Sequence, residues 1–177
     1  MKATGIVRRI DDLGRVVIPK EIRRTMRIRE GDPLEIYTNP GGEVIFKKYS
    51  PMGELSEFAK EYADALSSET KLSVLICDRD RCVSAAGISK RDTIEREVTD
   101  DLEKIVEKRM GFVNENNKKL TALEGLPNNI CAVSPILSAG DISGAVVLLE
   151  NNNCKVTNES DISLISVAAK FLGNRTM

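Results

Sequence analysis

The chain contains no histidine among its 177 residues. Zinc sites that use histidine, and nucleophile systems that pair serine or cysteine with histidine, are therefore excluded. The four cysteines, Cys77, Cys82, Cys131 and Cys154, form no C-x-x-C pair. We expect mostly buried, reduced thiols, with no catalytic residue, no metal and no cofactor.

Long apolar runs are also missing. No stretch approaches the roughly 20 apolar residues that a membrane helix needs, and the opening "MKATGIVRRIDD" has no apolar region of the kind found in signal peptides. We therefore expect a cytoplasmic protein without a membrane partner. Hydrophobic residues make up 41% of the chain and charged residues 30%, which is typical of a globular chain with one or two domains.

The net charge of −1 conceals an uneven distribution of charge along the chain. Residues 1–50 hold 11 basic and 7 acidic side chains, whereas residues 51–177 hold 15 basic and 20 acidic ones. The excess is greatest in residues 1–29, with 9 basic against 3 acidic side chains. A basic amino-terminal part on an acidic remainder indicates that the first part meets a polyanion.

Residues 1–52 predict a small β-rich domain. We expect strands over 3–10 and 14–18 around the turn "DDLG", a short helix "KEIRRTM" after Pro19, and a hairpin from "PLEIYTN" and "EVIFKK". A unit of about 50 residues buries too little surface to be stable alone, and neither disulfide nor metal is available to staple it. We therefore expect an obligate homodimer through this domain.

The short helix after Pro19 carries cations on one side. On a helical wheel with Ile22 at zero, Met26 falls at about 40°, on the same side. The cations fall at about 100° to 200°; they are Lys20, Arg23, Arg24 and Arg27. Like charges repel on such a helix, and a phosphate backbone would relieve the repulsion. The pattern suits DNA as a partner, but on charge alone a solvated basic face stays the commoner alternative.

A boundary is expected at "YSPMG". Residues 53–70 then form an amphipathic connecting helix, and residues 71–177 form a second domain. In that domain we expect hairpins from "KLSVLICDRD" with "RCVSAAG" and within "NICAVSPILSAGDISGAVVLLE", a charged helix over 90–110, and a final helix capped by Thr157 or Asn158. The fold class is α+β, with an antiparallel sheet and flanking helices.

Residues 1–50 resemble the AbrB-type swapped-hairpin DNA-binding domain of bacterial transition-state regulators. The resemblance rests on "DDLGR", "GRVVIPKEIRR" and "GDPLEIY". It implies a barrel of two interleaved chains that binds double-stranded DNA. The DNA contacts that it implies are Arg8, Arg9, Arg15, Arg23 and Arg24, with Lys2 and Lys20 as less certain matches. The whole chain resembles transcription regulators, activators and repressors, of sporulation genes in Gram-positive spore formers.

The second domain resembles a GAF domain, through its flanking helices and the segment "SPILSAGDISGAVVLLE". Such domains bind small ligands or serve as dimerisation modules. The sequence gives no residue set for a particular ligand, so an unknown small molecule stays open. Dimer contacts in both domains would give a homotetramer.

Two other functions stay open at this point. The cysteines of the GAF-like domain could form a redox sensor or a thiol reductase, although Cys77 lies in an apolar strand and no histidine is available to activate it. The swapped hairpin also occurs in antitoxins. Antitoxins usually continue into a disordered acidic tail, whereas more than 100 residues of folded pattern follow here.

Overall fold

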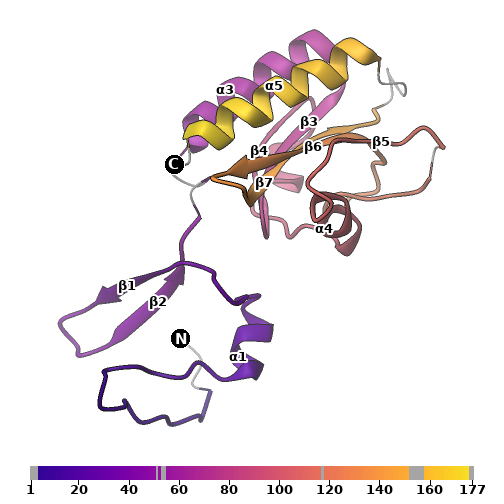
Figure 1. Ribbon diagram of the computed structural model, residues 1–177. Helices are drawn as coiled ribbons and strands as arrows, with labels where there is room; N and C mark the ends of the chain where they lie inside the picture. The colour runs from indigo at the N-terminus through magenta and orange to yellow at the C-terminus, as the bar shows by residue number, and fades with distance from the viewer. Residues whose placement is uncertain (1–3, 51, 53–54, 117, 152–157, 176–177) are drawn as a thin grey trace. The chain divides into compact units, whose positions relative to one another are not determined.

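The structure of the chain is a computed structural model that describes residues 4–50, 52, 55–116, 118–151 and 158–175. The chain divides into two compact units, Met1–Tyr49 and Ser50–Met177, which we call the head and the body (Figure 1). Within the described residues, no helix is both long and apolar enough to cross a membrane.

The head contains one short helix and one hairpin. Helix α1 spans Lys20–Thr25, and strand β1 (Leu34–Thr38) pairs antiparallel with β2 (Val44–Lys48). Asn39 closes the turn between the strands, because its side-chain oxygen accepts a hydrogen bond of 3.1 Å from the Glu43 amide. The predicted helix and the second predicted hairpin are therefore confirmed.

The strands predicted over 3–10 and 14–18 are not formed within the described part of a single chain. Residues 4–18 are irregular apart from the turn at "DDLG". The Asp11 amide donates to the Arg15 carbonyl at 3.1 Å, but this bond closes the turn and does not extend into a ladder. A strand needs a hydrogen-bonded neighbour, and the head of one chain provides none for these residues. The prediction of two strands is therefore wrong for the isolated chain.

The head also has no buried core of its own. None of residues 4–49 is classed as buried, and all the buried apolar side chains of the described structure belong to the body. Twelve large apolar side chains of the head are exposed instead: Ile6, Val7, Ile10, Leu13, Val16, Val17, Met26, Ile36, Tyr37, Val44, Ile45 and Phe46. So much exposed apolar surface on so small a unit marks an interaction face.

The body is built on a five-stranded antiparallel sheet. Its strands are β3 (Ser73–Asp78), β4 (Cys82–Ala86), β5 (Phe112–Val113), β6 (Ile130–Ser138) and β7 (Asp141–Leu149), in the order β4-β3-β7-β6-β5. Both hairpins predicted from the apolar segments of the body are confirmed. The two-residue strand β5 carries no such pattern and was not predicted.

Helices cover both faces of this sheet. Helices α3 (Ser56–Thr70) and α5 (Glu159–Arg175) lie side by side over one face, and α4 (Asp100–Val106) lies on the other (Figure 1). Side chains of β3 alternate between the two apolar layers, with Val74 and Ile76 facing α3 and α5. Leu75 and Cys77 belong to the opposite layer. This two-layered core confirms the α+β fold class.

The helix predicted over 90–110 is much shorter than expected. A 3₁₀ turn at Lys90–Asp92 is followed by irregular chain, and only Asp100–Val106 is α-helical. The intervening chain forms single bridges to other segments, Arg81 with Glu97 and Val98 with Leu123. The backbone groups of this segment therefore bond across the body, and the Thr99 side chain caps the helix by accepting from the Leu102 amide at 3.3 Å.

The final helix begins as predicted. The Asn158 side chain accepts a hydrogen bond of 2.8 Å from the Asp161 amide, and the Asp161 carboxylate accepts one of 3.2 Å from the Asn158 amide. This reciprocal pair satisfies two backbone groups at the helix start. Asn158 is thus the cap, whereas Thr157, the alternative, lies outside the described residues.

Candidate nucleic-acid interface

Arg15 is held by the turn that precedes it. The Asp11 carboxylate accepts hydrogen bonds from the Leu13 amide (3.0 Å), the Arg15 amide (2.7 Å) and the Arg15 Nε (2.8 Å). Gly14 has a φ of +77°, a backbone conformation that favours glycine. These bonds engage only Nε of the guanidinium, and the Arg15 side chain remains 69% exposed.

The same contacts change the titration of Asp11. The hydrogen bond from the Arg15 amide, assisted by the Arg15 guanidinium and the Leu13 amide, holds the pKa of Asp11 below its usual value of 3.8. The charged carboxylate is therefore the form that the turn prefers. Sequence reasoning assigned Asp11 to the turn but missed its contact with Arg15. An aspartate four residues before the arginine, with a glycine between them, was the available signal.

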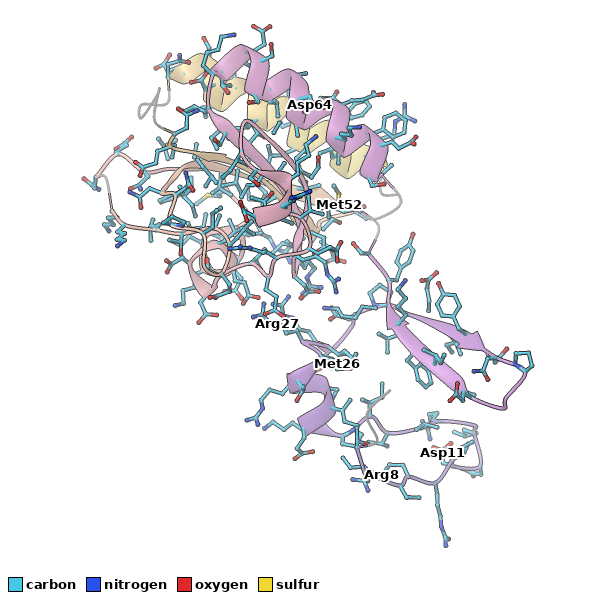
Figure 2. All side chains as sticks on the ribbon, turned by 180° about the vertical axis from the view of Figure 1, so that it is seen from behind. Arg8, Asp11, Met26, Arg27, Met52 and Asp64 are labelled. Atoms are coloured by element: carbon cyan, nitrogen blue, oxygen red, sulfur yellow. The ribbon has the colours of Figure 1, made fainter. Side chains whose placement is uncertain are left out.

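Arg8 and Arg9 lie on the irregular segment ahead of this turn. Both are exposed, and Arg8 donates from Nη1 to the Val7 carbonyl at 3.2 Å. Figure 2 shows Arg8 and Asp11 on the loop ahead of α1. The head thus presents two arginines before the turn and one after it.

Helix α1 carries the next three cations. It begins directly after Pro19, and its side chains Lys20, Arg23 and Arg24 are all exposed, whereas Ile22 is half-buried. The predicted division into an apolar and a basic side is therefore present over Lys20–Thr25. Lys2, the remaining predicted contact, lies outside the described residues.

Arg27 does not extend the basic side of the helix. The helix ends at Thr25, and Arg27 follows with a φ of +50°. The Ile28 amide donates to the Arg23 carbonyl at 2.7 Å, and the Arg27 amide to the Arg24 carbonyl at 3.2 Å, which is the Schellman pattern of helix ends. The wheel position predicted for Arg27 is therefore wrong, because the residue lies past the helix terminus.

Lys48 ties the end of α1 to the hairpin of the head. Its Nζ donates to the Arg27 carbonyl at 2.8 Å and lies 3.6 Å from an Asp32 carboxylate oxygen. The same carboxylate oxygen of Asp32 accepts from the Arg29 amide at 2.8 Å. These contacts hold the segment that follows α1, which includes Arg27 (Figure 2), to the end of the hairpin.

The cysteines of the body do not resemble an active site. Cys77 and Cys82 are fully buried and Cys131 is 8% exposed. Contact with the Cys82 thiol, together with burial, raises the pKa of Cys77 well above its usual value. A protonated, buried thiol is a poor nucleophile. Among the described residues, no group of three or more cysteine or acidic side chains is placed to hold a metal.

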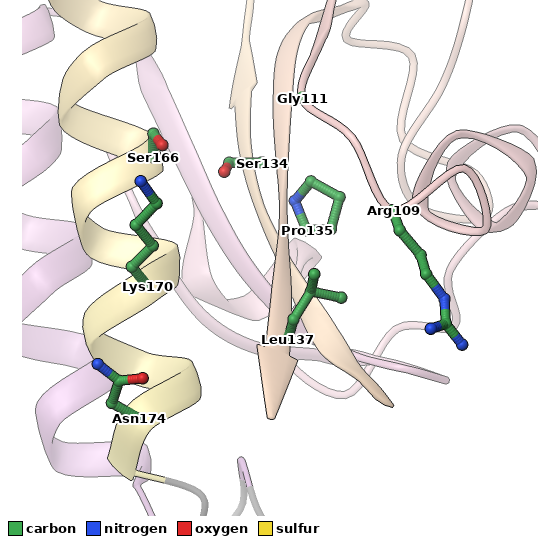
Figure 3. Close-up of a pocket in the computed structure, with 8 residues that line it drawn as sticks. All are labelled: Arg109, Gly111, Ser134, Pro135, Leu137, Ser166, Lys170 and Asn174. Atoms are coloured by element: carbon green, nitrogen blue, oxygen red, sulfur yellow. The ribbon is translucent and has the colours of Figure 1, made fainter. Parts of the chain in front are cut away.

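The body contains an open cavity of about 370 Å³ between β6 and α5. Ser166, Lys170 and Asn174 border it from α5, and Arg109 lies beyond β6 (Figure 3). The Arg109 guanidinium donates to the Gly140 carbonyl at 2.8 Å. The two cations therefore do not converge on one point, and the lining indicates no particular ligand.

Comparison with known proteins decides the family. Residues 54–177 match the family described as "Stage V sporulation protein T C-terminal, transcription factor". The chain is 49% identical to stage V sporulation protein T of Bacillus subtilis (strain 168), over 99% of this chain and 98% of that protein. The chain belongs to the stage V sporulation protein T family. This is a family of transcription factors and not of enzymes, which removes the thiol reductase alternative.

The two units match different proteins. Residues 7–53 match the family described as "Antidote-toxin recognition MazE, bacterial antitoxin". Over 51 residues the chain is 61% identical to the transition state regulatory protein AbrB of Bacillus subtilis (strain 168), covering 29% of this chain and 52% of AbrB. The head is therefore an AbrB-type domain, as the resemblance implied, and the antitoxin match is confined to it.

The body has the fold of a GAF domain. Its structure is similar to the GAF domain of the Acinetobacter phosphoenolpyruvate-protein phosphotransferase, with a TM-score of 0.56 over 73% of this chain and 84% of that chain. Because only 10% of the residues are identical, the likeness concerns the fold alone. The predicted GAF-like architecture is confirmed at that level.

Proposed function

We propose that the chain regulates transcription by binding double-stranded DNA through the arginines of a homodimeric head. The observation that carries this proposal is that the head of a single chain, over residues 4–49, has neither a buried apolar core nor paired strands in residues 4–18. Among the described residues, its twelve large apolar side chains stay exposed and its irregular residues 4–18 pair with no strand. A second copy supplies both, because strands from one chain can pair with those of the other while the apolar faces are buried.

The dimer also multiplies the charge available to DNA. The predicted contacts Arg8, Arg9, Arg15, Arg23 and Arg24 are all exposed in the head. A two-fold axis doubles them and matches the two-fold arrangement of phosphates on a duplex. Arginine also pairs two donors with O6 and N7 of guanine, so part of the set can read bases. Sequence-dependent DNA shape supplies the remaining selectivity.

The body supplies further association in this proposal. The outer sides of α3 and α5 expose Phe58, Leu164 and Val167, although these helices bury other residues against the sheet. Arg175 lies over the rings of Phe58 and Phe171, at 5.5 and 5.3 Å. An exposed apolar strip of this kind fits a helix pair from a second body, so that two dimeric heads form one homotetramer. Activation or repression of sporulation genes in the cytoplasm, and a small-molecule ligand for the body, stay predictions.

A double substitution tests the DNA contacts. We expect R23A/R24A to weaken duplex binding at least tenfold with the fold intact, because both side chains are exposed on α1 and bury no apolar surface. Fluorescence anisotropy measures binding, and circular dichroism measures the fold.

The matched control removes the same charge from the body. K104A/K108A alters two exposed lysines in or just after α4, and it should leave DNA affinity within about twofold. If both double variants lost the same DNA affinity, the effect of R23A/R24A would come from net charge and not from a contact made by α1. Wild-type DNA affinity in R23A/R24A would contradict the assignment of Arg23 and Arg24 as DNA contacts.

A further inference from the structure

The β3–β4 hairpin brings two cysteines of the body into direct register. Cys77 of β3 pairs with Cys82 of β4, next to a bulge between Ile76 and Cys77. Both thiols are free and fully buried, and they contact each other. Four residues separate them in sequence, so the pair lies at the base of the hairpin turn.

The backbone bonding shows which kind of strand pair this is. The Cys82 amide donates to the Arg96 carbonyl at 2.9 Å, and the Cys82 carbonyl accepts from the Glu95 amide at 2.9 Å. Both polar groups of Cys82 therefore point away from Cys77, which makes the two cysteines a non-hydrogen-bonded pair. Opposed residues of such pairs have Cα atoms about 4.5 Å apart, inside the range of roughly 4.4–6.8 Å that disulfides span.

We propose that Cys77 and Cys82 form an oxidisable dithiol, which a peroxide converts into an intrachain disulfide. This site is independent of DNA binding by the head. When the segment around Glu95 opens and admits water, one thiol loses its proton, and the thiolate attacks a peroxide oxygen; it becomes a sulfenic acid while the O–O bond breaks and water leaves with the proton. The second thiol then attacks that sulfur, the S–S bond forms, and a second water leaves. Hydrogen peroxide is reduced to two waters, and the two thiols together lose two electrons and two protons.

The segment around Glu95 lies next to Cys82 and is bonded to its backbone. Glu95 is exposed and has a φ of +65°. A non-glycine residue in this conformation is strained, so this segment is expected to open more easily than the buried sheet. The ion pair between Arg81 and Glu95, at 2.6 Å, is also at the surface. Oxidation is therefore expected to be slow but to need no global unfolding.

The cysteine pair lies next to Asp78, which binds Ser50, the first residue of the body. Asp78, which follows Cys77, accepts from the Asp80 and Arg81 amides through Oδ1, both at 2.8 Å. Its other oxygen accepts from the Ser50 hydroxyl at 2.8 Å. A disulfide at this point would stiffen the turn that holds Ser50. The dithiol is thus next to the contact by which the chain enters the body.

Peptide mapping of the oxidised full-length protein tests the proposal. The native protein is treated with hydrogen peroxide, its remaining thiols are blocked with N-ethylmaleimide in denaturant, and trypsin is added. Cleavage after Arg79 and Arg81 separates peptide 72–79 from peptide 82–90, so the two stay linked only through a disulfide. We expect the linked pair, a loss of two of the four thiols per chain, and full reversal by dithiothreitol.

Single substitutions supply the controls. Cys131 belongs to the apolar layer on the other face of the sheet, so C131A should give the linked peptides at the wild-type rate, whereas C82A should give none. If C82A fails to fold, the wild-type map still decides. Retention of all four thiols, disulfides between chains, or separate sulfinic acids at Cys77 and Cys82 would each overturn the proposal.

Discussion

At the scale of single residues, the head depends on how a few side chains fix its arginines. The five arginines taken from the family resemblance are all exposed in the structure. Sequence reasoning placed Asp11 in the turn but missed its contact with Arg15, because that contact depends on the local geometry of the carboxylate, which bonds the Arg15 amide and Nε. Arg27 was misjudged because a wheel assumes that a helix continues, whereas this helix ends two residues earlier.

The turn around Asp11 should depend on pH. The pKa of Asp11 is lowered in the folded head, so its contribution to the turn is complete above the unfolded pKa of about 3.9 and is lost as pH falls through the lower, folded value. We expect the Leu13 and Arg15 amide resonances to stay constant from pH 7 to pH 5 and to move only below about pH 4. NMR spectra of the wild type and of D11N check this.

The neutral amide of D11N should abolish this acid transition, and D12N should retain it. Asp12 makes none of the bonds that define the turn. A transition that survives in D11N would assign the pH dependence to another group.

At the scale of elements, apolar patterns predicted the strands that bury one or both faces. The β1–β2 hairpin of the head follows an alternation of apolar and polar residues, and the hairpins of the body follow nearly continuous apolar runs. The strand prediction failed for residues 3–10 and 14–18, which find no strand partner among the described residues. The helix prediction over 90–110 failed because bridges such as Val98 to Leu123 compete with the helix. A sequence pattern indicates the local conformational preference of a segment and which of its residues are buried. It does not show which distant segment will supply the hydrogen-bond partners.

Helix α5 depends on a close approach that the sequence does not reveal. A Cβ atom added at Gly173 would lie 2.1 Å from the Leu137 carbonyl oxygen of β6. We therefore expect G173A to destabilise the body by about 1–3 kcal/mol, as in overpacked cores. Glycine to alanine inside a helix otherwise stabilises by roughly 0.5–1 kcal/mol. Urea unfolding followed by circular dichroism measures the change.

The neighbouring position offers a control on the same helix. Asn174 is exposed, so N174A should change the free energy of unfolding by less than about 0.5 kcal/mol. If G173A proved as stable as the wild type, the tight packing of α5 on β6 would be refuted.

At the scale of the whole molecule, the two units differ in how complete they are. The body has two apolar layers around its sheet, whereas no apolar side chain of residues 4–49 is buried. The sequence predicted this difference in core formation, because the head is short and basic whereas the remainder of the chain is longer and acidic. The division of labour that we propose, a head that reads DNA and a body that assembles heads, follows from it.

The proposed assembly of bodies can be broken without harming the head. Val167 is 63% exposed on α5, and V167D places a charge within the apolar strip. We expect light scattering to show a tetramer for the wild type and a dimer for V167D, because burying an unpaired carboxylate is costly. Met110, 68% exposed elsewhere on the body, gives the control: M110D should remain tetrameric. A dimeric wild type would reject the tetramer.

The salt dependence of DNA binding tests the central proposal most directly. The affinity of the full-length protein for duplex DNA is measured by fluorescence anisotropy over a series of salt concentrations. If the ten arginines of a dimeric head all met phosphates, the log–log slope would approach −9, at roughly −0.9 per phosphate, and arginines that read bases make it shallower. We expect a steep negative slope that becomes shallower in R23A/R24A. A slope near zero, unchanged by that substitution, would contradict DNA recognition by the arginines of the head.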